Sequence, residues 1–123
     1  MKKLLIIIFC IFLLSGCGGT KNTDSSDGSV NYMEAKEKII NDGAILLDVR
    51  TKEEYDDKHI DGASLLPLDE INIDSISKLV SDKDIPIIVY CRSGNRSKQA
   101  KEKLIALGYS KVYDLGAMNN WKE

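Results

Sequence analysis

Two short apolar segments constrain the fold of this chain more than any other feature of its sequence. Residues 44–49 (AILLDV) and 86–90 (PIIVY) are almost wholly apolar and end where polar residues begin. Runs of this kind are typical of strands that are buried on both faces of a parallel sheet. The alternation of such strands with helical spacing predicts an α/β fold, a three-layer sandwich with a central, mainly parallel sheet. Helices are expected at 32–42, 52–57, 73–80, 97–107 and 118–121, and weaker strands at 63–66 and 111–114.

The N-terminal segment has the pattern of a secretory signal peptide. Lys2 and Lys3 precede an apolar run at residues 4–14, which is shorter than the ~20 residues that cross a bilayer. A short membrane anchor that stays in place is the alternative. Residues 14–17 (LSGC) resemble the lipobox of bacterial lipoproteins, which implies that residues 1–16 are removed and that Cys17 is lipidated. Two or more acyl chains, palmitate among them, would then hold the protein durably at a membrane.

The rest of the chain divides into a tether and one domain. Residues 17–29 have almost nothing to bury and are expected to form a flexible tether, followed by a domain at 30–123. The net charge is −2, and loss of the two leader lysines lowers it to −4, which argues against nucleic acid as a partner. We therefore expect a monomeric domain that is lipid-anchored at the extracytoplasmic face of a bacterial cell membrane.

Of the three cysteines, Cys10, Cys17 and Cys91, only the last keeps a free thiol in the mature chain that these patterns predict. An unpaired thiol in an extracytoplasmic protein indicates reactivity or pairing with another chain. Cys91 directly follows the strand at 86–90, at the edge of the sheet where α/β proteins bind ligands. A buried structural cysteine is the alternative, because cysteine is among the most buried residue types.

The residues after Cys91 favour its ionised form. A loop that leads into a helix can turn several N–H groups toward an anion. Gly94 and Asn95 tolerate the positive φ that such a loop needs, and Arg92 and Arg96 add two positive charges. Environments of this kind lower the pKa of a cysteine below its usual value of about 8.5. The loop therefore predicts a thiolate and needs no general base.

Three motifs resemble those of single-domain rhodaneses, a family of sulfurtransferases, over residues 30–121. They are LLDVRTKEEYDDKHIDGA (46–63), IIVYCRSGNRS (87–97) and LGAMNNW (115–121), in this order. Ala117 stands where the family usually has a second glycine, a departure that is expected to cost little. Four residues separate Cys91 from Arg96, whereas the similar loop of cysteine phosphatases is one residue longer and encloses a larger anion.

The resemblance implies a sulfurtransferase that works through Cys91. The thiolate would take the outer sulfur of a donor such as thiosulfate as a persulfide and pass it to cyanide or a thiol. No cofactor and no metal are implied. The residues implied in donor binding are Arg92, Ser93, Gly94, Asn95, Arg96 and Ser97 of the loop, together with Arg50.

Other interpretations remain open from the sequence. The domain could be a binding or redox-partner module that handles persulfides and uses thiosulfate poorly, or, less favoured by the loop length, a phosphatase or an arsenate reductase. Asp48 and Arg50 are interpreted mainly as a structural pair, His59 as part of a turn, and Trp121 as a cover for the core. The acidic cluster is interpreted as a solvated surface and not a metal site; it comprises Asp56, Asp57 and Asp61.

Overall fold

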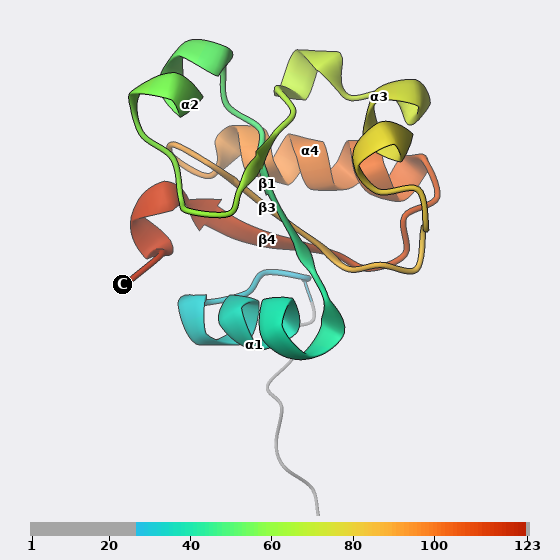
Figure 1. Ribbon diagram of the computed structural model, residues 1–123, viewed down its shortest axis with the longest axis horizontal. Helices are drawn as coiled ribbons and strands as arrows, with labels where there is room; N and C mark the ends of the chain where they lie inside the picture. Colours follow the sequence, from blue (N-terminus) through green and yellow to red (C-terminus); the bar gives the residue numbers. More distant parts are fainter. Residues whose placement is uncertain (1–26, 123) are drawn as a thin grey trace, which may run out of the picture.

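The computed structural model describes residues 27–122, so the predicted signal peptide, Cys17 and most of the tether lie outside the described residues. Four parallel strands form one sheet in the order β2-β1-β3-β4. Helix α1 covers one face of this sheet, and α3 and α4 cover the other (Figure 1). The prediction of a three-layer α/β sandwich with a parallel sheet is therefore confirmed.

None of the helices within residues 27–122 is long and apolar enough to cross a bilayer.

Most bounds of the elements are close to those expected from the sequence. The strands are β1 (Ile45–Asp48), β2 (Ser64–Leu65), β3 (Ile87–Cys91) and β4 (Val112–Ala117). The helices are α1 (Tyr32–Asp42), α2 (Lys52–Asp57), α3 (Ile73–Leu79) and α4 (Asn95–Ala106), with 3-10 turns η2 (Leu68–Glu70) and η3 (Met118–Asn120).

Local sequence explains where the first two helices begin. Asn31 and Glu34 form a capping box at the start of α1, and Thr51 and Glu54 form another at α2, as their spacing predicts. Each box satisfies N–H groups that the first turn of a helix leaves without a partner. Helix α1 ends at Gly43, whose φ of 70° lies in the left-handed region.

Strand β3 separates two parts of the core, because its side chains alternate between the faces of the sheet. Ile87, Val89 and Cys91 pack in the cluster that includes residues of α3 and α4. Ile88 and Tyr90 pack in the cluster that includes residues of α1. The side chain of Cys91 therefore faces the layer that contains α4.

Several boundaries differ from the sequence-based prediction. Helix α4 begins at Asn95 instead of residue 97, and residues 118–120 form a 3-10 turn instead of the start of a helix. Strand β4 continues to Ala117, past the predicted end at 114. The register skips one residue of β4 between Val89 and Tyr90 of β3, and Gly116, with a φ of 81°, lets the pairing continue after this bulge.

The folded part also begins before the predicted domain boundary at residue 30. The carbonyl oxygen of Gly28 accepts a hydrogen bond from the N–H of Asp114 across 2.9 Å. Ser29 forms an isolated parallel bridge with the same residue. The last residues assigned to the tether are therefore attached to the edge strand β4, a contact that their small polar side chains do not reveal.

Candidate active site

Cys91 is the last residue of β3 and lies opposite Ala117 of β4 in the parallel register. Its side chain is fully buried, which agrees, taken alone, with the alternative of a structural cysteine. The surroundings of the sulfur are not purely apolar, however, because the N–H of Gly94 donates to Sγ across 3.0 Å. A backbone N–H at the start of a helix stabilises negative charge on such a sulfur.

The loop after Cys91 is tighter than the sequence suggested, since only residues 92–94 separate β3 from α4. Gly94 has a φ of 99°, and a Cβ there would meet atoms of β4 only at ordinary contact distances. Glycine is therefore required by the backbone conformation. Asn95 does not share this conformation, because within residues 27–122 only glycines have positive φ. Ser97 is buried, and its hydroxyl supports the loop by donating to the carbonyl oxygen of Gly94 across 3.0 Å.

Arg96 lies in the first turn of α4 and forms a two-point ion pair with Glu54 of α2. Nη1 donates to Oε1 across 2.7 Å, and Nη2 donates to Oε2 across 3.0 Å. These hydrogen bonds lower the pKa of Glu54 to about 2, although partial burial acts in the opposite direction. Nothing in the sequence points to this pair, because the capping box already accounts for Glu54 locally. The predicted contact between Arg96 and a donor must therefore compete with an internal carboxylate.

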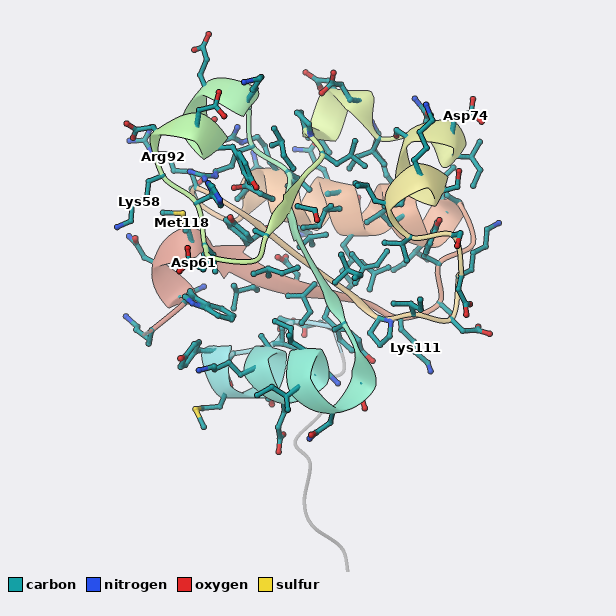
Figure 2. The ribbon with its side chains drawn as sticks, viewed as in Figure 1. Lys58, Asp61, Asp74, Arg92, Lys111 and Met118 are labelled. Carbon is teal, nitrogen blue, oxygen red and sulfur yellow. The ribbon has the colours of Figure 1, made fainter. Side chains whose placement is uncertain are left out.

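Arg92 and Ser93 form the exposed rim of the loop. Within residues 27–122 Arg92 forms no ion pair, in contrast to Arg50 and Arg96. Figure 2 shows its side chain at the same end of the molecule as Lys58. Arg92 is thus the arginine of the loop whose charge is available to an anionic donor, and the donor-binding roles of Arg92 and Ser93 stay predictions.

The motif at the end of β1 forms a buried network with Tyr90 of β3, the residue before Cys91. Asp48 and Arg50 are 0% and 6% exposed, and the guanidinium donates to the carboxylate through Nε and Nη2, the latter across 2.7 Å. Arg50 Nη2 also donates to the carbonyl oxygen of Lys58 across 2.6 Å. The Tyr90 hydroxyl donates to Asp48 Oδ2 across 2.7 Å and accepts the N–H of Ile60 across 3.2 Å. Burial and the bond to Asp48 raise the pKa of Tyr90.

This network buries Arg50 away from the loop at residues 92–97, which contains the other residues that the resemblance implied in donor binding. Its guanidinium is held among protein acceptors and has little exposed surface, as a structural pair with Asp48 requires. A donor could meet Arg50 only if these buried bonds were broken. The role of Tyr90 in this network could not be predicted from the sequence, because Tyr90 is indistinguishable there from the other apolar residues of the strand.

His59 belongs to the turn between α2 and β2, as expected. Its ring stacks on that of Tyr55, with centroids 3.7 Å apart and planes 7° from parallel. Its Nδ1 lies 2.8 Å from the carbonyl oxygen of Tyr55. Because a carbonyl oxygen only accepts, Nδ1 must carry the proton in this contact. The Tyr55 hydroxyl in turn donates to the carbonyl oxygen of Ala63 across 2.7 Å, which secures the end of the turn.

The acidic residues and the tryptophan also take the positions that the sequence suggested. Asp56, Asp57 and Asp61 are exposed, as a solvated surface requires. Trp121 packs against the core cluster of the α1 face and meets the Tyr32 ring edge-on, with centroids 4.9 Å apart.

Comparisons with known proteins assign this chain to one family. The family model described as the rhodanese-like domain matches residues 32–123. The thiosulfate sulfurtransferase PspE of Escherichia coli is 39% identical over 74 residues, which cover 60% of this chain and 70% of PspE. The thiosulfate sulfurtransferase GlpE of Coxiella burnetii is 31% identical over 94 residues, which cover 76% of this chain and 85% of GlpE.

A solved structure supports the same assignment. The structure described as a rhodanese with anions from E. coli superimposes with a TM-score of 0.59 and 38% identity, over 63% of this chain and 89% of that chain. The family match extends from the start of α1 to the end of the chain and therefore includes every residue of the Cys91 loop. The chain belongs to the rhodanese-like family and is a rhodanese-like enzyme.

Proposed function

We propose that this protein is a sulfurtransferase that moves a sulfane sulfur from a donor such as thiosulfate to a thiophilic acceptor through a persulfide on Cys91. The relatives named thiosulfate sulfurtransferases support the sulfurtransferase class. The observation that carries the proposal is the hydrogen bond from the Gly94 N–H to Cys91 Sγ, across 3.0 Å, at the start of α4. A structural cysteine has no need of such a donor.

The chemistry divides into two displacements at sulfur. In the first, the Cys91 thiolate attacks the outer sulfur of thiosulfate, the S–S bond of the donor breaks, and sulfite leaves with the bonding electron pair. In the second, cyanide or a thiolate attacks the outer sulfur of the persulfide and restores the Cys91 thiolate. The negative charge passes from Sγ to the outer sulfur of the persulfide in the first step and returns in the second, and the loop N–H groups would stabilise both anions from fixed positions. A covalent intermediate of this kind predicts ping-pong kinetics.

The size of the loop favours sulfur over phosphate chemistry. Three residues connect β3 to α4, and the buried Ser97 hydroxyl holds the Gly94 carbonyl in place. Cys91 has no exposed surface, so the groups that cover the sulfur must move to admit one more sulfur atom, and a tetrahedral phosphate would require a larger movement.

Mass spectrometry of the purified chain after thiosulfate treatment tests this proposal. We expect the peptide that contains Cys91 to gain the mass of one sulfur atom, to lose it on addition of cyanide, and to gain nothing in the Cys91→Ser variant. Absence of the adduct together with turnover of an aryl phosphate would support a phosphatase. Absence of both, with Cys91 still titratable by a thiol reagent, would support a binding module without sulfur transfer.

We propose further that Cys17 anchors the domain at the extracytoplasmic face of a bacterial membrane. The proposal rests on the LSGC sequence at residues 14–17 and on the apolar run before it. Expression in a bacterial host with radiolabelled palmitate tests it. We expect labelled protein in the membrane fraction, and loss of the label in Cys17→Ala but not in Cys10→Ala. Equal labelling of the two variants would contradict the proposal.

A further inference from the structure

Helix α1 carries two large apolar side chains on the face that points away from the sheet. Ile39 packs against the core cluster of this layer, whereas Met33 and Ile40 are 69% and 73% exposed. These two residues lie about two turns apart on one side of the helix, because a turn takes 3.6 residues. Lys36 and Glu37, which lie between them, are exposed and carry opposite charges. The outer face of a surface helix is usually polar, so this apolar line marks α1 as unusual.

Aromatic side chains and lysines extend this face at the N-terminal end of α1. The Trp121 ring meets the Tyr32 ring edge-on, with centroids 4.9 Å apart, and Lys36 Nζ lies 5.3 Å from the centroid of the Tyr32 ring. A hollow beside them is lined in part by Tyr32, Met33 and Lys122. We call the following residues the α1 surface: Tyr32, Met33, Lys36, Ile40, Trp121 and Lys122. Apolar, aromatic and lysine side chains together are typical of surfaces that lie at the boundary between lipid headgroups and acyl chains.

The predicted tether enters the domain beside the α1 surface. Gly28 and Val30 form backbone hydrogen bonds with Asp114 at the edge of β4, and Val30 lines the same hollow. Ten residues (18–27) lie between Cys17 and this point, and a flexible segment of that length spans roughly 20 Å. A domain of about 100 residues has a radius of gyration of about 13 Å and hence a diameter of roughly 30 Å. A lipid on Cys17 would therefore hold the side of the domain that carries the α1 surface close to the bilayer.

We propose that the α1 surface rests on the lipid bilayer to which Cys17 is anchored, with Met33 and Ile40 inserted just below the headgroups. This orientation rests on the proposed lipid anchor and adds to it the side of the domain that faces the lipid. Two apolar side chains bind a bilayer weakly by themselves, but the anchor makes docking an intramolecular step with a high effective concentration. The stems of Lys36 and Lys122 can lie along the apolar surface while their ammonium groups stay among the headgroups.

The same orientation leaves the Cys91 loop open to water. The side chain of Cys91 packs in the core cluster that includes residues of α3 and α4, on the face of the sheet opposite α1 (Figure 1). The sheet therefore lies between the bilayer and the sulfur. Donors and acceptors dissolved in water would reach the loop without crossing the lipid.

Fluorescence of the lipidated chain in vesicles tests this orientation, because Trp121 is the only tryptophan of the chain. The vesicles contain equal amounts of phosphatidylcholine and phosphatidylglycerol, with the phosphatidylcholine brominated near the glycerol end of its acyl chains. We expect the brominated lipid to quench Trp121 and the bilayer to shield Trp121 from acrylamide in the water. Met33→Glu and Ile40→Glu should each lower the ratio of docked to undocked protein roughly tenfold, the factor that corresponds to the burial of one large apolar side chain. The double variant should lose the quenching by lipid.

A control variant and two labels separate the possible outcomes. Ile105→Glu is the control, because Ile105 is 50% exposed on α4, on the other side of the sheet, and it should leave the quenching by lipid and by acrylamide unchanged. Palmitate-labelled protein whose Trp121 is quenched by acrylamide and not by lipid would overturn the orientation and leave the anchor intact. Shielding from acrylamide without quenching by lipid would also overturn it, and would indicate a second copy of the chain on the α1 surface. Absence of the palmitate label would overturn the anchor, and the orientation with it.

Discussion

Two arginine–carboxylate pairs lie near the Cys91 loop, and they differ in burial and in the number of their partners. In the Asp48–Arg50 pair the side chains are 0% and 6% exposed, and Tyr90 and a backbone carbonyl complete their hydrogen bonds. In the Glu54–Arg96 pair they are 26% and 31% exposed. The first pair can be broken only by leaving a charge buried, whereas water or a ligand can replace either partner of the second.

This difference assigns separate roles to two arginines that look equivalent in the sequence. Removing one partner of a buried pair costs about 3–5 kcal/mol, since the other charge is left without compensation. An exposed pair contributes about 0–1 kcal/mol. We infer that Arg50 holds the residues next to the loop in place. Arg96 can exchange its bond to Glu54 for one to an anionic donor.

The largest expected effect comes from breaking the buried pair. Asp48→Asn keeps the shape of the side chain but leaves the Arg50 guanidinium buried and uncompensated. We expect the free energy of unfolding to fall by about 3–5 kcal/mol, measured by urea denaturation. Tyr90→Phe is the control and should cost less, about 1–3 kcal/mol, because it removes two buried hydrogen bonds but leaves no charge without its partner. Equal losses of unfolding free energy in the two variants would show that the ion pair contributes no more to stability than the hydrogen bonds of Tyr90.

A smaller effect is expected at the partly exposed Glu54–Arg96 pair, and it concerns substrate binding more than stability. Glu54→Gln retains a side chain that can complete the capping box of α2 while releasing the charge of Arg96. We expect the KM for thiosulfate to fall about threefold, and the free energy of unfolding to change by less than about 1 kcal/mol. Glu53→Gln, an exposed neighbour on the same helix, should change neither value. A higher KM in Glu54→Gln would mean that Glu54 orients Arg96 for the donor.

The comparison also shows which features a single sequence can reveal. The strands that contain Asp48 and Tyr90 could be predicted, because an apolar run between turn residues is a local signal. The capping box that includes Glu54 is equally local. The hydrogen bond between Tyr90 and Asp48 and the pair between Arg96 and Glu54 each join residues 42 positions apart. Their geometry exists only after the strands are paired, so no local pattern reports it.

The sequence left the burial of Cys91 undecided for a related reason. The composition of residues 92–96 permits either an open loop or an early start of the helix, because Asn95 suits both a turn and a first helical turn. In the structure the helix starts at Asn95 and the loop closes over the sulfur. The first turn of this helix contains Arg96, whose partner Glu54 lies 42 residues away in the sequence, so a local pattern does not report the contacts of this turn.

The smallest predicted effect is a dependence of stability on pH that originates at Glu54. Its pKa in the folded chain is about 2, below the ordinary value of 4.5, because Arg96 binds the ionised form. A depressed pKa contributes stability that is fully present above pH 4.5 and is lost as the pH falls toward 2. Because the pair is partly exposed, solvent screening limits this contribution to about 1 kcal/mol.

Urea denaturation between pH 5 and pH 2 measures this contribution as the difference in stability between the wild-type chain and Glu54→Gln. The difference is needed because other carboxylates titrate in the same range. We expect the stability of the wild-type chain to fall more steeply with acid than that of Glu54→Gln, and the two curves to converge near pH 2. Glu53→Gln should follow the wild-type curve. Parallel curves for wild type and Glu54→Gln would mean that Arg96 does not hold Glu54 in solution, and that its charge is already available to the donor.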